Sequence, residues 1–244
     1  MACRVRKNQS DKTTDNCLPA FLPKKVMNLI GDIQGNYHTL RALLKQMPDE
    51  EPVSVGDMVD RGPRSKEVLE FFRLHGKALL GNHEHMMLDY FKGTEIYMPH
   101  IWLLNSGDAT LYSLELERSS SLPEVLLDYL ESLPLLIKEE GLIVTHAPIH
   151  RRLSIEDISS SDHLENCPLE ESVIWNREDP VPREGYFQVF GHNGYRYSRA
   201  HFFDKGFMIH SDTAFAVCID TIRGQLLSGI HWPTRQIYTQ EYID

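Results

Sequence analysis

Residues 26–35 have the sequence VMNLIGDIQG and residues 52–62 have the sequence PVSVGDMVDRG, and in each stretch a short apolar run ends at Gly-Asp. A run of this length that ends at glycine is typical of a strand buried on both faces. Between the two runs, four apolar residues have the i, i+3, i+4, i+7 spacing of one helix face: Leu40, Leu43, Leu44 and Met47. The sequence therefore predicts a strand at 26–30, a helix, and a second strand at 52–55.

The same alternation continues along the chain. A second helix is indicated by three apolar residues at helical spacing, Val68, Leu69 and Phe72. We expect it to end with Gly76 at its C′ position. Residues 77–80 form a third apolar run, which ends at Gly81. The order β-α-β-α-β favours a parallel, buried sheet with right-handed crossovers.

The rest of the chain predicts helices followed by further strands. Helical patterning covers about residues 85–133, and apolar runs at 142–145 and 187–190 predict two more buried strands. Strand-like stretches, expected to be antiparallel, then alternate with turn signals at 207–210, 215–219, 226–230 and 236–242. The fold class expected is α/β, as a four-layer α/β/β/α sandwich with a mixed central β-sandwich, or at least an α/β domain with a mixed second sheet.

Residues 1–25 differ in character from the remainder. They are polar and include the proline-punctuated stretch LPAFLP at 18–23. This composition predicts a flexible N-terminal tail with a short docking segment, followed by a single domain at 26–244.

Charge and composition exclude several classes of protein. The chain has 25 basic and 35 acidic residues, and a net charge of −10 disfavours general nucleic-acid binding. The four cysteines have no CxxC spacing, which argues against a disulfide framework. No apolar stretch is long enough to cross a membrane, and the N-terminus lacks the apolar region of a signal peptide. We therefore expect a cytoplasmic protein without membrane partners, whose oligomeric state the sequence does not indicate.

Polar side chains follow each of the five predicted inner strands. In order they are Asp32 and Gln34, Asp57 and Asp60, Asn82 and His83, His146, and His192. A single Gly-Asp or Gly-His is more often an ordinary turn, but ligands of open α/β sheets bind outside the carboxyl ends of the strands. So many polar groups converging there would stay unpaired unless something binds them. The occurrence of such residues after all five strands therefore predicts a functional site.

The residue types indicate what that site binds. Carboxylates, amide oxygens and imidazoles, without a thiolate, suit Mn, Fe, Zn or Co better than Ca or an iron–sulfur cluster. A site with this many ligands can hold two cations, which one carboxylate would bridge at roughly 3.5–4 Å in the manner of hydrolytic two-metal sites.

The motifs also resemble a known family. GDIQG at 31–35, GDMVDRG at 56–62, GNHE at 81–84, a strand-terminal His146 and a later Gly-His pair resemble the metallophosphoesterase (calcineurin-like) superfamily. The DRG and GNHE forms are typical of its PPP-type Ser/Thr protein phosphatase branch. Further stretches are similar to the phosphatase of bacteriophage lambda and its bacterial relatives: GNHEHMMLDYF (81–91), IWLLNSG (101–107), LPLLI (133–137) and SVIWNRE (172–178).

The resemblance implies a set of metal ligands. Asp32 and Asp57 would hold one metal, with Gln34 in the position of the family's histidine. Asp57 would bridge to a second metal, which Asn82, His146 and His192 complete. The resemblance implies two divalent ions, with manganese preferred and Fe, Zn, Co or Mg as alternatives.

It also implies the catalytic and substrate-binding residues. Arg61 and Arg177, together with Asn82, would contact the phosphate, because guanidinium groups form paired hydrogen bonds to phosphate oxygens. His83 would be the general acid, oriented by Asp60. A water bridging the metals would attack phosphorus directly, without a covalent intermediate.

The sequence departs from the branch at two places. Gln34 is a weaker, neutral donor than imidazole, so the first metal should bind more loosely, and a glutamine here also resembles some symmetrical diadenosine tetraphosphatases. The family's late Asp-Thr-Gly is matched only by Asp212-Thr213-Ala214 and Asp220-Thr221-Ile222, to which we assign no function.

Three functions compete. The first is a metal-dependent phosphomonoesterase acting on phosphoserine and phosphothreonine of proteins, and on small phosphoesters. The second is a symmetrical diadenosine tetraphosphatase-like hydrolase, for which Tyr195, Tyr197 and Tyr37 are candidate base-stacking residues. The third is an inactive phosphate-binding regulatory protein, which the intact site residues disfavour.

Overall fold

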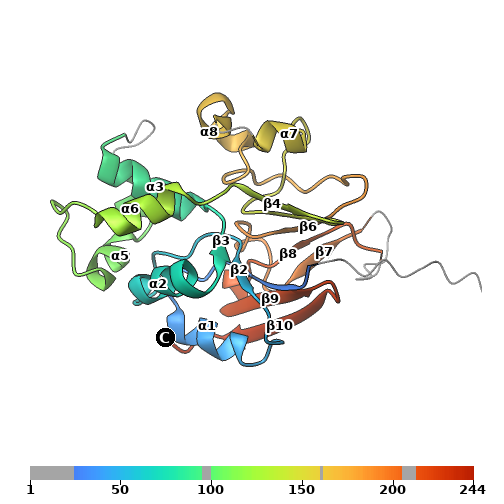
Figure 1. Ribbon diagram of the computed structural model, residues 1–244, viewed down its shortest axis with the longest axis horizontal. Helices are drawn as coiled ribbons and strands as arrows, with labels where there is room; N and C mark the ends of the chain where they lie inside the picture. The colour runs from blue at the N-terminus through green and yellow to red at the C-terminus, as the bar shows by residue number, and fades with distance from the viewer. Residues whose placement is uncertain (1–24, 95–99, 160–161, 205–212) are drawn as a thin grey trace, which may run out of the picture.

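Two five-stranded sheets stacked face to face form the centre of the molecule (Figure 1), as seen in a computed structural model that describes residues 25–94, 100–159, 162–204 and 213–244. The first sheet has the order β10-β9-β1-β2-β3. Its strands are β1 (Met27–Ile30), β2 (Pro52–Ser54), β3 (Lys77–Ala78), β9 (Leu226–Trp232) and β10 (Gln236–Glu241). β1, β2 and β3 are parallel, whereas β9 runs antiparallel to both β1 and β10. The predicted parallel sheet is therefore confirmed and extended by an antiparallel pair.

The second sheet has the order β4-β5-β6-β8-β7. Its strands are β4 (Leu136–Glu139), β5 (Leu142–Thr145), β6 (Phe187–Phe190), β7 (His201–Phe203) and β8 (Ala216–Cys218). β5, β6 and β8 are parallel, and the edge strands β4 and β7 are antiparallel to their neighbours. The expectation of antiparallel late strands is thus confirmed for β9 and β10 but wrong for the β6–β8 pairing.

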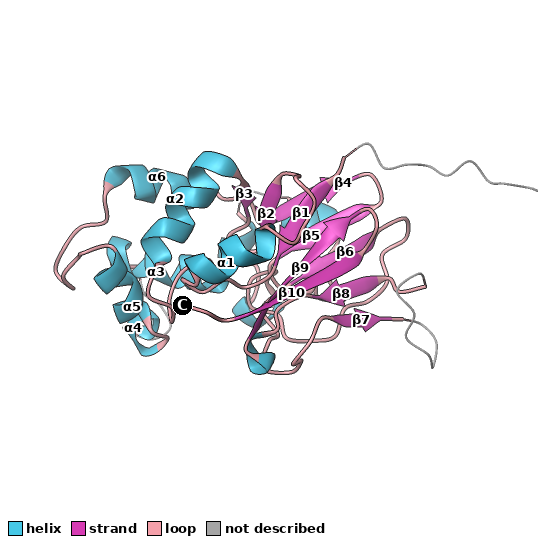
Figure 2. Ribbon diagram, turned by 90° about the horizontal axis from the view of Figure 1, so that it is seen from below, coloured by secondary structure: helices cyan, strands magenta, loops and turns pink. Residues whose placement is uncertain are grey.

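Helices cover the outer face of the first sheet, and two short helices lie beside the β4 end of the second, in agreement with the expected layered α/β fold (Figures 1 and 2). α1 (Tyr37–Leu44) and α2 (Ser65–His75) pack on the first sheet. Beyond them lie α3 (Asn82–Lys92), α4 (Ile101–Leu104), α5 (Gly107–Ser113) and α6 (Glu124–Glu131). On the side of the second sheet lie α7 (Ile155–Ile158) and α8 (His163–Asn166), and short 3-10 turns occur at Leu169–Glu171 and Ile222–Gly224. No helix in the described part of the chain is long and apolar enough to cross a membrane.

One apolar layer lies between the two sheets, and a second lies between the first sheet and the helices. Leu29 and Val53 from the first sheet meet Val144, Val189 and Val217 from the second, and all five are buried. Burying one such side chain contributes about 1.5–3 kcal/mol to folding. Strands that face this layer on one side and helices on the other are buried on both faces, which is why their sequences are almost continuously apolar.

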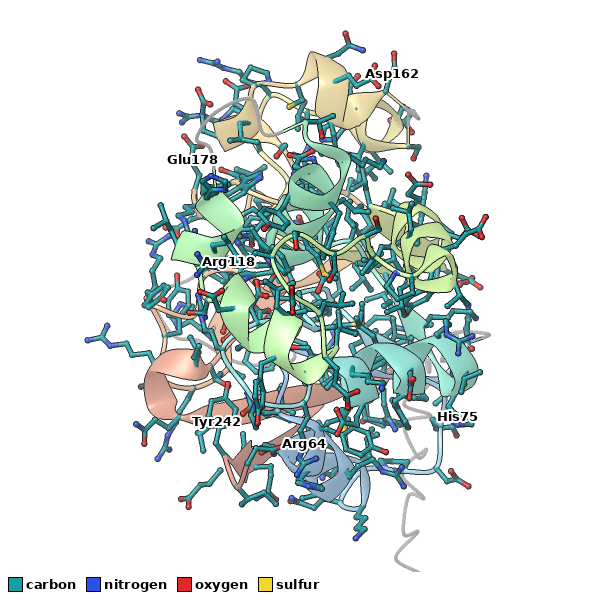
Figure 3. The ribbon with its side chains drawn as sticks, turned by 90° about the vertical axis from the view of Figure 1, so that its left-hand side faces the viewer. Arg64, His75, Arg118, Asp162, Glu178 and Tyr242 are labelled. Carbon is teal, nitrogen blue, oxygen red and sulfur yellow. The ribbon has the colours of Figure 1, made fainter. Side chains whose placement is uncertain are left out.

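The C-terminal residues return to the helical layer. A carboxylate oxygen of Asp244 lies 4.0 Å from Nε of Arg64, and Figure 3 shows Arg64 and Tyr242 on the lower part of the helical face. The Asp244 carboxylate also accepts hydrogen bonds from the backbone N–H groups of His38 and Thr39, at 2.9 and 2.7 Å. It therefore caps α1, whose own N-cap residue Asn36 makes no side-chain cap.

Some predicted boundaries differ from the structure. Gly76 does end α2, but its φ of −155° is extended rather than left-handed, so no C′ turn of the expected kind forms. The edge strands β4 and β7 are not predicted by the pattern, and their residues are mostly only partly buried. The predicted strand at 207–210 and the tail, apart from Lys25, lie outside the described residues.

Candidate active site

Loops that follow the parallel strands of both sheets meet at one edge of the sandwich. The backbone N–H groups of Ile33 and Gln34 donate to the carbonyl oxygen of Asp57, at 3.0 and 2.8 Å, which joins the loops after β1 and β2. In the second sheet, the N–H of Gly191 donates to the carbonyl of His146 at 2.8 Å. The polar residues at the strand ends are therefore held together by the backbone itself.

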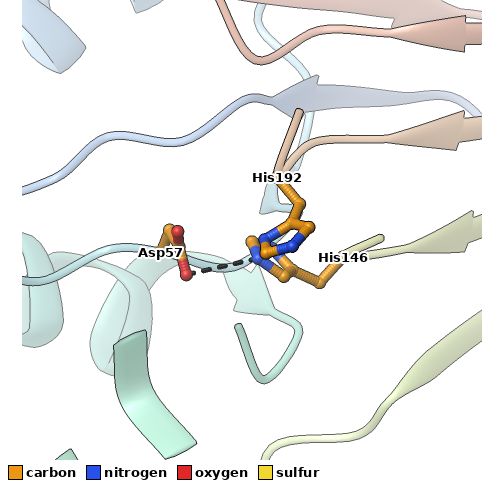
Figure 4. A group of neighbouring side chains, drawn as sticks. All are labelled: Asp57, His146 and His192. Carbon is orange, nitrogen blue, oxygen red and sulfur yellow. Dashed lines mark ion pairs between the residues drawn. The ribbon is translucent and has the colours of Figure 1, made fainter. Parts of the chain in front are cut away.

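Asp57, His146 and His192 form a buried cluster (Figure 4). One ligand atom from each lies within 4.8 Å of the others, and Nε2 of His146 is 3.3 Å from Oδ1 of Asp57. The amide oxygen of Asn82 is 3.0 Å from Nε2 of His146 and 2.9 Å from Nδ1 of His192. Nδ1 of His146 lies 3.0 Å from the carbonyl of Val55, which orients the ring so that Nε2 faces the cluster.

The protonation states of this cluster suit a cation. Burial lowers the pKa of His146 and holds the pKa of His192 well below its usual range, which favours the neutral form of both imidazoles. Burial acts to raise the pKa of Asp57, but the neighbouring His146 and His83 outweigh it and hold the pKa at about 2. A carboxylate and two neutral imidazoles are together a suitable donor set for a late first-row divalent metal.

A second group of acidic and amide side chains adjoins the first. Burial, together with the carboxylates of Asp220 and Asp57, raises the pKa of Asp32 well above its usual range. Oε1 of Gln34 is buried and has no hydrogen-bond partner in the described structure. Crowded buried carboxylates are costly unless a cation balances them, and a buried amide oxygen without a partner is costly as well. Asp32, Gln34 and Asp57 therefore also fit a metal site.

His83 stands beside both groups, in the first turn of α3. Its Nδ1 lies 2.6 Å from Oδ2 of Asp60, and its Nε2 lies 3.8 Å from Oδ2 of Asp57. Burial lowers the pKa of His83, but the Asp57 and Asp60 carboxylates outweigh burial and hold that pKa above its usual value. Trp102 Nε1 donates to both oxygens of Asp60 at 3.0 Å, and Thr110 Oγ1 donates to Oδ1 at 2.6 Å. The Asp60 carboxylate is thus held by three side chains, those of His83, Trp102 and Thr110.

The two arginines lie at the rim of the site. Nη2 of Arg61 is 3.5 Å from Nε2 of His83, and the guanidinium lies over the ring of Tyr195, with Cζ 5.6 Å from the ring centroid. Arg177 is exposed, and its Nη1 donates to the carbonyl oxygen of His192 at 3.1 Å. The Arg61 guanidinium therefore lies beside His83, and the Arg177 guanidinium lies beside the backbone of His192.

Comparison with known proteins identifies the family to which the chain belongs. The family model described as calcineurin-like phosphoesterase matches residues 28–214. The chain belongs to the calcineurin-like phosphoesterase family. The resemblance seen in the strand-end motifs is thereby confirmed, and the two-sheet sandwich is the fold expected for such a phosphoesterase.

Named relatives of this phosphoesterase fall into two groups. The chain is 28% identical over 193 residues to serine/threonine-protein phosphatase 1 of Salmonella typhimurium. The aligned region covers 73% of this chain and 85% of the relative. The chain is 32% identical over 148 residues to a symmetrical bis(5′-nucleosyl)-tetraphosphatase of Shewanella sediminis, which covers 55% of this chain. The matched region spans only 49% of that tetraphosphatase. The phosphatase branch is therefore supported, and the family alone does not separate the two substrates.

Solved structures confirm the fold. A putative diadenosine tetraphosphatase has a TM-score of 0.62 at 22% identity, covering 93% of this chain and 97% of that one. A Saccharomyces cerevisiae serine/threonine phosphatase has a TM-score of 0.58 at 15% identity, covering 91% of this chain and 81% of that one. At these identities the likeness concerns the phosphoesterase fold.

Glu84 has a structural role, because its side chain bonds the backbone of the loops after β2 and β3. Its carboxylate accepts from the N–H groups of Asp57 (2.8 Å), Met58 (2.7 Å), Val59 (3.2 Å) and Gly81 (3.0 Å). Burial, followed by the nearby Asp57, raises the pKa of Glu84 to about 7. The loop that carries Asp57 is therefore fixed by hydrogen bonds to one buried side chain.

Asp220, one of two candidates for the late Asp-Thr-Gly to which the sequence alone assigned no function, lies in the candidate site. It follows β8, is buried, and lies against Asp32, whose pKa it helps to raise. Its carboxylate also accepts from the N–H groups of Gly194 and Ile222. The available signal was an Asp directly after the apolar run at 215–219, the pattern that marks the other strand ends, although it lacks the glycine that four of those five ends carry.

Proposed function

We propose that this family member is a phosphoesterase that uses two divalent cations, one held by Asp32, Gln34 and Asp57, the other by Asp57, Asn82, His146 and His192. The observation that carries the proposal is the buried Asp57–His146–His192 cluster, with the Asp32 carboxylate crowded against Asp220 and Asp57. Oε1 of Gln34, in the loop whose backbone is bonded to Asp57, is buried and without a hydrogen-bond partner in the described structure. Manganese is the proposed metal, because Mn²⁺ accepts carboxylate and amide oxygen ligands, which Asp32, Gln34 and Asp57 would supply.

Bound cations would polarise the phosphate oxygens and lower the pKa of water at this site. The chain supplies the remaining chemistry. Arg61 and Arg177 would hold the phosphate oxygens, and Asn82 would contact both the phosphate and the metal that His146 and His192 bind. His83 donates the proton on Nε2 to the leaving oxygen, while Asp60 accepts the hydrogen bond from Nδ1 and keeps the ring in place. Attack by water requires positioning and charge neutralisation, so no covalent intermediate is needed.

The first candidate substrate is phosphoserine or phosphothreonine on a protein. The Asp60-Arg61-Gly62 and Asn82-His83-Glu84 forms of the sequence support it. The Salmonella typhimurium relative, matched over 85% of its length, bears the name of a serine/threonine phosphatase. We also propose that residues 26–244 act as one domain, which is supported by a first sheet that joins β1–β3 with β9 and β10. Cytoplasmic location stays a prediction.

The second candidate is a dinucleoside tetraphosphate. The specific observation in its favour is Tyr195, whose exposed ring lies over Arg61 at the rim of the site. Gln34 and the relatives named as symmetrical tetraphosphatases support it further.

The test is an activity panel on metal-stripped protein with Mn, Mg, Co or Zn added back. Its substrates are a phosphothreonine peptide, p-nitrophenyl phosphate and diadenosine tetraphosphate. Mn-dependent release of phosphate from the peptide supports the first candidate, and preference for the dinucleotide supports the second. Asp57→Asn should abolish turnover while thermal unfolding stays cooperative, and Asp89→Asn, on the surface of α3, should leave turnover unchanged. Silence of the wild type on every substrate with every metal contradicts the proposal and favours a phosphate-binding regulatory protein.

A further inference from the structure

The loop after β6 holds a tyrosine at the mouth of the site. The N–H of Gly194 donates to the carboxylate of Asp220, and the N–H of Arg196 donates to the carbonyl of Asn193 at 2.9 Å. A Cβ at Gly194 would come within 2.1 Å of Oδ1 of Asp220, so backbone and carboxylate are in direct contact. The backbone on both sides of Tyr195 is therefore fixed relative to the strand ends.

The ring of Tyr195, by contrast, faces solvent. Its residue is 64% exposed, although it is a large side chain with an apolar ring. The other two candidate stacking tyrosines are engaged elsewhere: Tyr37 packs against Phe71 at a centroid distance of 6.4 Å, and Tyr197 stacks on His201 at 4.2 Å. Tyr195 is thus the candidate whose ring stands beside the site.

Arg61 connects this ring to the proposed general acid. Its Cζ lies 5.6 Å from the Tyr195 centroid, and its Nη2 lies 3.5 Å from Nε2 of His83. Since His83 protonates the leaving oxygen, Tyr195 stands on the side from which the leaving group departs. The cation–π contact with Arg61 also limits how the ring can turn.

We propose that Tyr195 is a specificity-determining residue that stacks on a planar ring carried by the leaving group, either an aryl ring or a nucleobase. This proposal rests on the phosphoesterase function above and narrows its substrate class. An exposed tyrosine gives a large contact area at low conformational cost, and stacking of this kind tolerates different ring systems. Loss of one stacked ring corresponds to a decrease in kcat/KM of about tenfold.

The experiment compares ring-bearing and ring-free substrates on the full-length, Mn-loaded protein. Tyr195→Ala should lower kcat/KM about tenfold for p-nitrophenyl phosphate, for diadenosine tetraphosphate, or for both. It should leave β-glycerol phosphate unchanged within about twofold, because that leaving group has no ring. Tyr195→Phe should behave as wild type. Tyr112→Ala, at a tyrosine that is 83% exposed on α5, is the matched control.

The pattern of losses decides the outcome. A loss confined to the dinucleotide assigns the ring to a nucleobase, and a loss confined to the aryl phosphate assigns it to an aryl group. An equal loss on all three substrates overturns the proposal, because Tyr195 would then only support Arg61.

Binding gives a readout that does not depend on turnover. Calorimetry should show that Tyr195→Ala weakens binding of adenosine diphosphate, or of p-nitrophenyl phosphate to an Asp57→Asn background, about tenfold, while inorganic phosphate binds as before. If the wild-type protein is inactive on all substrates, the proposed function is contradicted, but the binding measurement still tests the stacking role of Tyr195. Unchanged affinity for both ring-bearing probes would overturn the stacking role itself.

Discussion

Asp60→Asn isolates the contribution of one buried charge to proton transfer. Asp60 is fully buried, with Oδ2 2.6 Å from Nδ1 of His83 and Oδ1 2.6 Å from Oγ1 of Thr110. Asparagine has the same shape and can keep its oxygen toward His83. Its new amide N–H₂ then faces Thr110, whose hydroxyl can rotate and accept a hydrogen bond, and Nε1 of Trp102 can still donate to the oxygen on the His83 side. The variant should therefore fold, and what it loses is the negative charge beside the imidazole.

The size of the effect follows from the hydrogen bond. A hydrogen bond to a charged group contributes about 1.5–3 kcal/mol, and a neutral one about 0.5–1.5 kcal/mol. The difference, roughly 1–2 kcal/mol, is lost from stabilisation of the protonated imidazole and corresponds to a rate decrease of about 5- to 30-fold. This decrease should appear in kcat for a phosphoserine peptide, whose alkoxide leaving group needs a proton. For p-nitrophenyl phosphate, whose leaving group departs as an anion, kcat should fall less than about threefold.

The controls separate proton transfer from general damage. His83→Ala should show the same split between the two substrates, with a larger loss of about 10²- to 10⁴-fold on the peptide. Asp89→Asn removes the carboxylate that lies 3.7 Å from Nδ1 of His85 on the surface of the same helix and should change neither rate. If Asp60→Asn slows both substrates equally, Asp60 maintains the metal ligands rather than the acid, and the reasoning is refuted.

Three further changes test metal binding, loop packing and capping. Gln34→Ala should raise the Mn²⁺ concentration needed for half-maximal activity by roughly tenfold or more, and Gln34→His should lower it; an unchanged titration would remove Gln34 from the ligand set. Gly191→Ala places a Cβ 2.1 Å from Oδ1 of Asp32, so we expect a loss of about 1–3 kcal/mol in urea unfolding together with most of the activity. Asp244→Ala removes the side chain that accepts from the N–H of Thr39 at 2.7 Å; it should cost about 1 kcal/mol of stability without changing kcat, and equal stability would show that α1 needs no such cap.

The site was predictable to the extent that it depends on strand ends. Parallel strands bring their carboxyl ends to one edge, so an apolar run followed by a polar residue locates that residue without further information. Asp32 after β1, Asp57 after β2 and His192 after β6 meet this condition. Gln34, whose side chain is buried and unpaired, is placed by the same loop.

The residues that sequence reasoning missed depend on contacts between distant segments. Asp220 joins the site because β8 pairs with β6 in parallel, and nothing in the local pattern of residues 215–219 distinguishes parallel from antiparallel pairing. Trp102 and Thr110 hold Asp60 from α4 and α5, 42 and 50 residues further along the chain. Helical spacing predicted those helices, but it carries no information about which carboxylate they would contact.

Backbone strain shows how the fold and the chemistry are coupled. Five non-glycine residues of the site have left-handed φ values: Gln34 (48°), Asp57 (52°), Asp60 (73°), Arg61 (60°) and His192 (63°). A residue held in such a sparsely populated conformation costs about 1–3 kcal/mol, and glycine at the same position would relieve it. Glycine, however, has no side chain to ligate a metal or hold a phosphate. These conformations persist because buried groups such as Glu84 fix the surrounding backbone. The strain lowers the stability of the fold, but it holds the side chains of the site close together.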